Sequence, residues 1–406
     1  MTIDLLEGPA ALVADAQLWP ALDRAVAERS GPLATIHLPG LRYNAADLLV
    51  RASGVPIRVA SKSVRVRAVL DAVLRLPGYR GILAYTLPEA LWLAHDHDDV
   101  VVGYPTADRA AIARLAADEQ AASRVTLMVD DLAQLDLIDA VVPPSRRPRL
   151  RVAIDADASW RAAVLGHIGV RRSPVHEPAQ AITLAHRIVA RGGFALVGLM
   201  MYEAQIAGQG DSTGSGDALI RWMQGRSLAE LADRRAAIVR GVRSVAPLRF
   251  VNGGGTGSLE TTAADTAVTE VTAGSGLFAG HLFDGYRAFH PAPATAFALE
   301  VVRKPTPDIV TVLGGGWIAS GPPLPSRQPL PVWPAGLRML AREGAGEVQT
   351  PLQGEAARRL SIGDRVWFRH AKSGEAAEHV EAYRLVEGER VVGEAPTYRG
   401  EGQAFL

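Results

Sequence analysis

The chain has 406 residues, which predicts two or three domains unless one of them is a large barrel. Hydrophobic residues make up 48% and charged residues 21% of it, and 43 basic residues match 43 acidic ones, the balance of a globular protein. Without a net charge the chain has no overall field that attracts nucleic acid or a membrane surface, and the absence of cysteine excludes disulfides and thiolate chemistry.

The N-terminus carries early acidic residues and lacks the basic and apolar regions of a signal peptide. No apolar run approaches the ~18 residues that a membrane-spanning helix needs. We therefore expect a cytoplasmic protein that binds neither nucleic acid nor membranes.

In chain order, the first strand predicted is LATIHLPG at 33–40, followed by the helical segment LRYNAADLLVRAS. From residue 56, eight short apolar runs alternate with plausible helices, and this alternation predicts parallel β/α units. Eight such units favour an α/β fold with a closed (β/α)8 barrel. The eight runs are PIRVAS, GILAY, DVVVGY, RVTLMVD, RLRVAIDA, FALVGLMMY, RFVNG and VTEVTAG, and the helices are expected at 64–75, 87–95, 107–118, 178–191 and 227–244.

After about residue 288, Pro and Gly separate short strands with little helical periodicity, as in TAFALEVVRK, DIVTVLGGG, RVWFRHA, EAYRLVE and ERVVGEA. This pattern is typical of a smaller, mainly antiparallel β domain. We expect residues 1–40 to be an N-terminal segment that adds a strand to the β domain, 41–287 to be the barrel and 288–406 to be the β domain. The basic run SRRPRLR at 145–151 is interrupted by prolines and is interpreted as a solvated loop.

Lys62 ends the first barrel strand, at the edge of the barrel where catalytic groups gather. Only three of the 43 basic residues are lysines, namely Lys62, Lys304 and Lys372. Because lysine is so rare in this chain, its presence at the end of a barrel strand favours a functional role. A lysine between strand and helix can lose its charge through desolvation and become a nucleophile that forms a Schiff base. The bland alternative is a lysine that merely follows a strand.

Two glycine-rich turns, VNGGGTGSLE at 251–260 and TAGSGLF at 272–278, follow the last two predicted barrel strands. Consecutive glycines let backbone N–H groups approach a phosphate, and barrels often hold phosphate at these two loops. Tyr202 follows another strand, and Arg171 and Arg172 lie in the loop after the strand before it. The segment AGQGDSTGSGD that comes after Tyr202 is either a lid or a disordered loop.

These features together imply pyridoxal 5'-phosphate, and the chain resembles the fold-type III pyridoxal-phosphate enzymes, the alanine racemase-like group. The motifs IRVASKS, GVRRSPV, GLMMY, NGGGTGS, the following AGS and the HA of RHAK carry the resemblance, which favours the D-threonine aldolase and D-serine dehydratase branch. The resemblance implies that Lys62 holds the cofactor as an imine. It places Arg172, with Arg171 as the runner-up, at the phenolic oxygen of the cofactor and Tyr202 near its ring nitrogen. The phosphate is expected on Gly253, Gly254, Gly255, Thr256, Gly274 and Ser275.

The resemblance implies a lyase that acts on D-configured β-hydroxy amino acids, by retro-aldol cleavage or by dehydration and deamination, in a homodimer. One alternative is a racemase or epimerase of the same fold, in which Tyr383 or Tyr398 serves as the second base. Another is a non-catalytic pyridoxal-phosphate-binding protein, against which the β domain argues. A third is a Schiff-base aldolase that acts on sugar phosphates without the cofactor. Trp317 is expected to shape the substrate pocket.

The stretch RHAKSGEAAEH at 369–379 departs from the family. In the aldolase and dehydratase relatives a histidine and an aspartate or cysteine two residues later hold a divalent metal, and here these positions are His370 and Lys372. A protonated lysine has no lone pair for a metal, so no metal is favoured. We expect His370 and Lys372 to be catalytic, the ammonium of Lys372 taking the place of the cation. A rebuilt metal site of His370 with Glu375 or His379, and an inert surface loop, are the alternatives.

Overall fold

The computed structural model describes residues 3–322 and 324–406 and divides the chain into two compact units. The first unit combines residues 1–47, 63–76 and 274–404, and the second combines 48–62, 77–273 and 405–406. Within the part of the chain that is described, no helix has the length and apolar character that crossing a bilayer requires.

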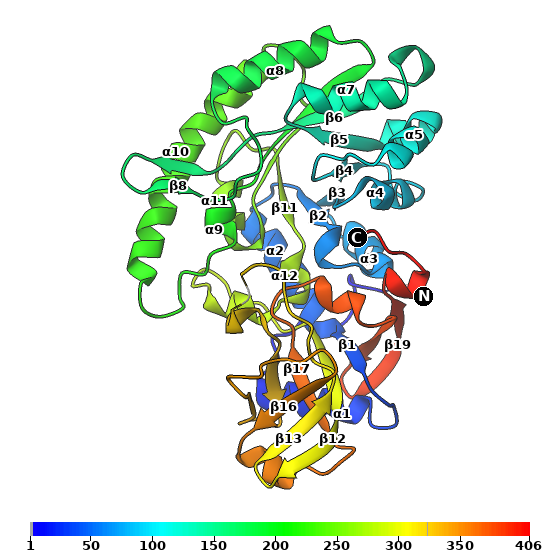
Figure 1. Ribbon diagram of the computed structural model, residues 1–406, viewed down its shortest axis with the longest axis vertical. Coiled ribbons are helices and arrows are strands. Elements are labelled where there is room, and N and C mark those ends of the chain that lie inside the picture. The colour runs from blue at the N-terminus through cyan, green and yellow to red at the C-terminus, as the bar shows by residue number, and fades with distance from the viewer. Residues whose placement is uncertain (1–2, 323) are drawn as a thin grey trace. The chain divides into compact units, whose positions relative to one another are not determined.

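The second unit contains a closed barrel of eight parallel strands, as predicted (Figure 1). All eight apolar runs form barrel strands, and the strand order closes β9 onto β10. The strands are β2 (Ile57–Ala60), β3 (Tyr79–Ala84), β4 (Val100–Val102), β5 (Val125–Val129), β6 (Leu150–Asp155), β9 (Phe194–Met201), β10 (Phe250–Gly253) and β11 (Glu270–Ala273).

Helices lie outside these strands in the second unit, and several begin where a side chain accepts a backbone N–H group (Figure 1). Asp131 accepts from the N–H of Ala133 at 2.8 Å, and Asp108 accepts from that of Ala111 at 2.9 Å, which stabilises both helix starts. The helices are α4 (Leu87–Leu93), α5 (Arg109–Ala117), α6 (Glu119–Arg124), α7 (Leu132–Val141), α8 (Pro178–Ala190), α9 (Ala204–Ala207), α10 (Asp217–Arg243) and α11 (Leu259–Ala263). Helix α10 begins ten residues before the predicted 227–244, because its polar first turns and Gly225 hide the helical pattern.

Apolar side chains from neighbouring strands of the barrel pack together, including Val101, Met128, Met200 and Phe250. Phe250 lies opposite Gly198 on the neighbouring strand, and a Cβ at Gly198 would lie 2.2 Å from the Phe250 ring. Glycine at 198 therefore makes room for the aromatic ring, so that this pair fills the barrel centre.

The first unit is built on a nine-stranded, mainly antiparallel sheet with the order β15-β16-β13-β12-β1-β18-β19, to which β17 and β14 are added beside β12. Strand β1 (Leu33–His37) pairs antiparallel with β12 and parallel with β18, so the early strand LATIHLPG lies inside this sheet. The other strands are β12 (Thr295–Thr306), β13 (Ile309–Leu313), β14 (Leu330–Trp333), β15 (Arg338–Met339), β16 (Gln349–Gln353), β17 (Arg365–Arg369), β18 (Ala382–Glu387) and β19 (Arg390–Pro396).

Helix α1 (Asp15–Ala25) packs on this sheet through Leu18, Trp19 and Leu22, which contact Trp367 and its neighbours. Helix α3 (Arg67–Leu74) and the short α12 (Ser275–Phe278) also belong to the first unit, and α2 (Leu38–Ala52) contains the boundary after residue 47. The predicted domain boundary at 287/288 lies inside this unit, which resumes at Gly274.

One expectation about a loop is wrong, and one hairpin was not predicted. The basic run at 145–151 is not a solvated loop, since Arg147 is buried and pairs with Asp139 at 2.6 Å, and Arg151 is the second residue of β6. The segment after β6 contains a hairpin of β7 (Trp160–Ala162) and β8 (Gly166–Ile168), which the pattern of the sequence did not indicate.

Candidate active site

Lys62 lies in the 3-10 turn η1 (Ser61–Ser63), directly after β2 and at the carboxyl end of the barrel, where it was predicted. Its Nζ is half-buried and donates to the hydroxyl of Tyr104 at 2.7 Å. Tyr104 follows β4 by two residues, so its phenol comes from another strand end of the same barrel. The contact holds the amine at a fixed place over the carboxyl ends of the strands.

Arg172 and Tyr202 lie next to this pair. The guanidinium carbon of Arg172 is 5.8 Å from the ring centre of Tyr104 and also 5.8 Å from that of Tyr202. Cation–π attraction favours this position between two aromatic rings. Both arginines are exposed, but Arg171 has no such ring contact among the described residues, so Arg172 and not Arg171 lies beside the tyrosines.

The loop that carries Arg172 is attached to the barrel through Ser173. The hydroxyl of Ser173 donates to the backbone oxygen of Asp155 at 2.7 Å and accepts from the N–H of Val175 at 3.0 Å. Asp155 is the last residue of β6. The end of β6 therefore fixes the start of the next segment, and with it the direction from which Arg172 approaches.

The first glycine-rich turn follows β10, as predicted, and passes close to Tyr202. Gly254 has a φ of +80°, which favours glycine, and a Cβ at Gly255 would lie 3.1 Å from Cε2 of Tyr202. Thr256 begins the 3-10 turn η3 (Thr256–Ser258). Lys62, Tyr104, Arg172, Tyr202 and this turn thus form one continuous set of contacts at the carboxyl ends of five strands of the barrel.

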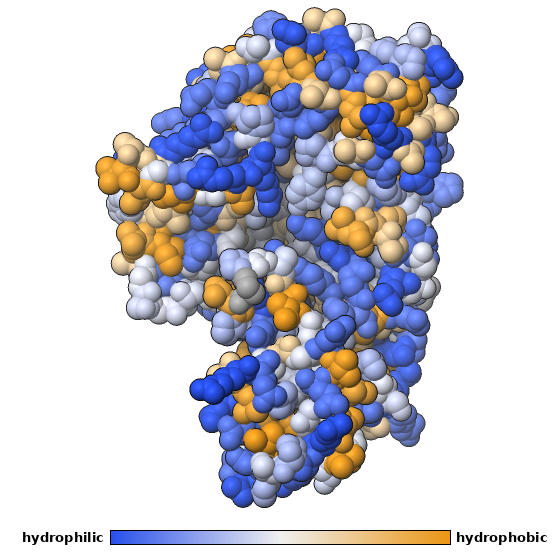
Figure 2. Space-filling model, viewed as in Figure 1, coloured by the Kyte–Doolittle hydropathy of each residue, from blue (hydrophilic) through white to orange (hydrophobic). Residues whose placement is uncertain are grey.

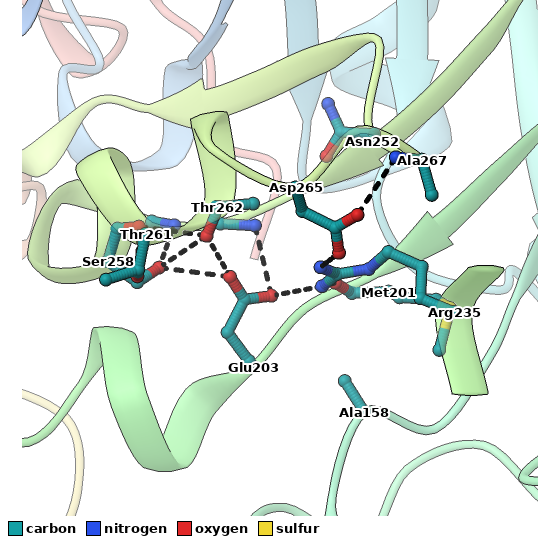
Figure 3. A network of polar contacts seen from close by, with 12 residues as sticks. Ala158, Met201, Glu203, Arg235, Asn252, Ser258, Thr261, Thr262, Asp265 and Ala267 are labelled. Carbon is teal, nitrogen blue, oxygen red and sulfur yellow. Dashed lines mark hydrogen bonds and ion pairs between the residues drawn. The ribbon is translucent and has the colours of Figure 1, made fainter. Parts of the chain in front are cut away.

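A buried carboxylate, that of Glu203, organises the glycine turn from behind (Figure 3). It accepts from the N–H of Gly254 at 3.2 Å and from the hydroxyls of Ser258 and Thr262. It also pairs with Arg235 of α10 at 3.0 Å, and Arg235 in turn pairs with Asp265 at 2.7 Å. Because Glu203 and Arg235 are almost fully buried, these contacts are strong and specify one conformation of the turn.

The second glycine-rich turn continues from β11 as predicted, with Gly274 at the start of α12 and Ser275 as its first residue. Both residues belong to the first compact unit. The backbone oxygen of Ser275 accepts from the hydroxyl of Ser373 at 3.0 Å, a contact inside that unit.

Burial shifts the pKa values of two acids near Arg172. Burial, together with the neighbouring Asp130, raises the pKa of Asp155 to about 7, and the charge of Arg172 opposes this shift. Burial also raises the pKa of Tyr202 to about 12, again against Arg172. Near neutral pH the Tyr202 phenol is therefore protonated, whereas the Asp155 carboxyl is present in both its protonated and its charged form.

A cavity of about 730 Å³ lies between the β7–β8 hairpin and the loop that carries Arg172. Arg161, Arg171 and Arg172 line it together with Asp157, which pairs with Arg161 at 3.3 Å, so basic side chains outnumber acidic ones in its wall. The hairpin tip and the first turns of α10 expose the apolar side chains of Val164, Leu165 and Leu219. Figure 2 shows several orange, hydrophobic areas on the surface of the molecule.

The predicted lid segment, residues 207–217, begins at the last residue of α9 and continues as a turn to the first residue of α10. The carboxylate of Asp217 accepts from the N–H groups of Thr213 and Gly214, both at 3.0 Å. The turn therefore has an ordered local structure, and its role as a lid stays a prediction.

His370 and Lys372 follow β17 in the first unit and have different surroundings. His370 is buried, and its ring nitrogens lie 3.2 Å from the Thr295 hydroxyl and 3.1 Å from the Ser373 hydroxyl. Burial, together with Arg369, lowers the pKa of His370 to about 3, so the ring is neutral. Lys372 is half-buried, and its Nζ donates to the hydroxyl of Ser320 at 3.3 Å.

Glu375 and His379, the two alternative metal ligands, make contacts with different residues. Glu375 accepts from the N–H of Ser320 at 3.0 Å, whereas the ring of His379 stacks on Trp317 with centres 4.9 Å apart. Trp317 in turn stacks on Phe297 at 4.0 Å. Among residues 3–322 and 324–406, no group of three or more His, Asp or Glu side chains is arranged to hold a metal ion.

Three residues of the site were not identified from the sequence: Tyr104, Glu203 and Asp155. Tyr104 and Asp155 stand at the ends of predicted strands, and that position alone could have marked them as candidates. Glu203 gave no such signal, since a single acid beside Tyr202 does not show that it turns inward to the glycine loop.

Comparison with known proteins supports the fold. No family model and no curated protein matches the chain. Among solved structures, D-threonine aldolase from Filomicrobium marinum is 19% identical with a TM-score of 0.77, and the match covers 92% of this chain and 96% of that one. D-threo-3-hydroxyaspartate dehydratase from Delftia sp. HT23 is 20% identical with a TM-score of 0.69, covering 92% and 98%. Alanine racemase from E. faecalis is 14% identical with a TM-score of 0.58, covering 86% and 92%.

The chain therefore has the alanine racemase-like fold, a closed parallel barrel combined with a mainly antiparallel β domain. The resemblance that the motifs indicated is confirmed at the level of the fold. Proteins that share this fold with the chain include an aldolase, a dehydratase and a racemase.

Proposed function

We propose that the chain is a pyridoxal-phosphate-dependent lyase that acts on D-configured β-hydroxy amino acids, by retro-aldol cleavage or by dehydration and deamination. The observation that carries the proposal is the set of contacts from Lys62 through Tyr104, Arg172 and Tyr202 to the glycine turn. An amine, an arginine, a phenol and a phosphate-binding turn at one end of a barrel are the groups that this cofactor requires.

The residues present fit the cofactor. Gly254 has a positive φ, and the third glycine of the turn lies against the ring of Tyr202, so larger residues would close the space that a phosphate needs. Lys62 supplies the amine to which the cofactor binds covalently. On this proposal Arg172 binds its phenolic oxygen and Gly253 to Thr256 bind its phosphate, and the part of Gly274 and Ser275 in phosphate binding stays a prediction.

When bound, pyridoxal phosphate withdraws electrons from the α-carbon of an amino acid. The residues of this chain orient the reacting groups and supply hydrogen bonds to them. The hydroxyl of Tyr104 orients Nζ of Lys62. Tyr202 stays protonated and can form a hydrogen bond but carries no charge, so it does not stabilise a fully charged ring nitrogen. This weaker electron withdrawal suits Cα–Cβ cleavage or elimination at least as well as chemistry that needs a long-lived carbanion.

A racemase of the same fold is the second candidate. That reaction needs a base on the opposite face of the substrate, and Tyr383 and Tyr398 were the predicted candidates. Tyr383 is 2% exposed, and Tyr398 is 1% exposed. Burial also raises the pKa of Tyr383, so its phenol is protonated near neutral pH and little phenolate is present to act as the base. These observations favour the lyase.

The test of this proposal is reconstitution with pyridoxal phosphate followed by borohydride reduction and peptide mapping. We expect the reduced adduct on Lys62, and neither adduct nor activity in Lys62→Arg, which keeps the charge but loses the nucleophilic amine. Lys304→Arg, in the β domain, is the matched control and should behave as the wild type. An adduct and full turnover in Lys62→Arg would refute the assignment of the site.

The reaction is identified by incubating the loaded protein with D- and L-forms of several β-hydroxy amino acids. Aldehyde indicates retro-aldol cleavage, keto acid indicates dehydration, and an inverted isomer indicates racemisation. We expect aldehyde or keto acid from D-isomers only.

We further propose that the ammonium of Lys372 stabilises negative charge that develops on the substrate oxygen. The side chain is positively charged and half-buried, and Ser320 links it to Glu375. On this proposal activity persists after exhaustive chelation, and Lys372→Met lowers the rate on the order of a hundredfold. Loss of activity with EDTA and recovery with Mn²⁺ would contradict it and favour the alternative metal site.

We also propose that the protein forms a homodimer in the cytoplasm. The exposed apolar side chains at the hairpin tip and the start of α10 support an interface, since patches of this kind often mark contacts between proteins (Figure 2). Sedimentation velocity tests the assembly, and a monomer at micromolar concentration would contradict it.

A further inference from the structure

Arg51 lies in the last turn of α2 and reaches the glycine-rich turn that follows β10. Its side chain is buried, being 8% exposed, and both Arg51 and the turn belong to the second compact unit. Arg51 belongs to none of the motifs that mark the site, so only its contacts indicate what it does.

The guanidinium of Arg51 joins two parts of this turn. Its Nε and Nη2 atoms donate to the two carboxylate oxygens of Glu260, at 3.0 Å for Nη2, and Nη2 also donates to the backbone oxygen of Thr256 at 2.5 Å. Glu260 lies in the first turn of α11, and Thr256 is the first residue of η3. Because a bidentate pair fixes the plane of the guanidinium, the Thr256 oxygen is held at one place relative to α11.

Arg51 and Glu203 hold opposite ends of the glycine sequence. Glu203 accepts from the N–H of Gly254, whereas Arg51 donates to the oxygen of Thr256. Glycine loses more conformational freedom on ordering than any other residue. A turn with three consecutive glycines therefore depends on contacts at both ends to keep one conformation.

The contact with Thr256 also determines the direction of the next N–H group. The peptide bond between Thr256 and Gly257 is trans, and in a trans peptide the C=O and the N–H point in opposite directions. Because Arg51 holds the oxygen of Thr256, the N–H of Gly257 points away from Arg51. The orientation of a backbone donor in the turn is therefore set from α2.

We propose that Arg51 is a positioning residue that makes the glycine turn selective for the phosphorylated cofactor. It orients the peptide group between Thr256 and Gly257 so that the N–H meets a phosphate oxygen. Arg51 itself needs no contact with the ligand. This role rests on the function proposed above and concerns the affinity for the phosphate group alone.

The test compares the dissociation constants of pyridoxal phosphate and of pyridoxal, which lacks the phosphate, by absorbance titration of the imine. We expect the wild type to bind pyridoxal phosphate far more tightly. Arg51→Met should lower this selectivity about tenfold, the effect of losing one hydrogen bond to a charged group. The dissociation constant of pyridoxal should stay close to that of the wild type, because pyridoxal makes no use of the phosphate site.

Arg147→Met is the matched control. Arg147 is also buried, pairs with Asp139 at 2.6 Å and donates to the backbone oxygen of Gly193 at 2.6 Å. Gly193 directly precedes β9, so these contacts lie at the end of the barrel where the strands begin. Arg147→Met should lose stability and keep the selectivity of the wild type.

A purely structural role of Arg51 predicts another result, in which Arg51→Met binds both ligands more weakly by the same factor. Selectivity equal to that of the wild type would overturn the proposal. If Arg51→Met does not fold, Glu260→Gln decides, since it weakens the hold on the guanidinium at a partly exposed position. A smaller fall in selectivity supports the role of Arg51, and unchanged selectivity refutes it. A wild type that binds both ligands equally would instead contradict the phosphate site of the proposed function, and this role with it.

Discussion

Tyr104 shows how much of the site depends on single hydroxyl groups. Its phenol is the acceptor for Nζ of Lys62 at 2.7 Å, and its ring contacts Arg172. Tyr104→Phe keeps the ring and removes the hydroxyl. We expect the cofactor to stay bound and the rate to fall about tenfold, because Lys62 loses its orientation. Titration of the variant with pyridoxal phosphate measures cofactor binding, and steady-state kinetics measure the rate. Loss of cofactor binding would contradict the prediction and show that the Tyr104 hydroxyl is needed to bind the cofactor.

Asp155 gives the protein a specific pH dependence of stability. Its carboxyl titrates near 3.8 when unfolded and near 7 when folded, so the folded state binds the proton more tightly. The stability from this group is fully present at low pH and falls as pH rises from about 4 to about 7, by up to ~1.4 kcal/mol per pH unit.

Asp155→Asn removes this titration. Urea unfolding of the cofactor-free wild type and variant at several pH values between about 4 and 8 measures the difference. We expect the advantage of the variant over the wild type to increase with pH and to become constant above about pH 7. A difference that does not change with pH would show that Asp155 titrates normally.

At the scale of elements, the glycine turn after β10 depends on the backbone freedom of Gly254. Gly254→Ala introduces a side chain at a φ of +80° and within 3.1–3.3 Å of Thr262. Gly54→Ala, at a φ of +87° with no atom within 4 Å, is the matched control, because it has the same backbone strain without the contact. Both should lose ~1 kcal/mol of stability. Only Gly254→Ala should also weaken cofactor binding, measured by titration, and equal binding in both would contradict the role of the turn.

Helix α10 reaches the same turn through Arg235. Glu203→Gln leaves the buried Arg235 with Asp265 as its remaining carboxylate, so we expect the free energy of unfolding to fall by ~3 kcal/mol. Glu355→Gln, which disrupts an exposed pair with Arg358, should cost less than ~0.5 kcal/mol. Urea unfolding of the two variants gives the comparison, and similar losses would mean that burial does not strengthen the Glu203 pair.

The elements that the sequence predicted correctly share one property. The eight barrel strands are short apolar runs that glycine, proline or a helix bounds, so local pattern is sufficient. Strands β14 and β16 were not predicted because LPVW and QTPLQ contain proline and alternate poorly. Lys62, Arg172, Tyr202 and the glycines were found because they stand at strand ends. The inward turn of Glu203 depends on Arg235, thirty-two residues later, and no local pattern contains that information.

At the scale of the whole molecule, the two units are each assembled from separate stretches of the chain. Strand β1 lies between β12 and β18, and all five of its residues are buried. We therefore expect residues 274–406 alone to remain unfolded, because two strands would lose their shared neighbour and its hydrogen bonds. Residues 3–47, joined by a flexible linker to 274–404, should restore cooperative melting in circular dichroism. A cooperative transition in the shorter fragment would contradict the prediction.

The position of β1 also has a consequence during protein synthesis. The ribosome releases LATIH early, but the partners of this strand lie in β12 and β18, more than 250 residues later. At roughly 5–20 residues per second, the nascent strand waits for tens of seconds without its neighbours. An apolar strand with free edges is prone to pair with other chains during such an interval. The rate of translation and the supply of chaperones that bind nascent chains should therefore control the yield of this protein more strongly than its final stability does.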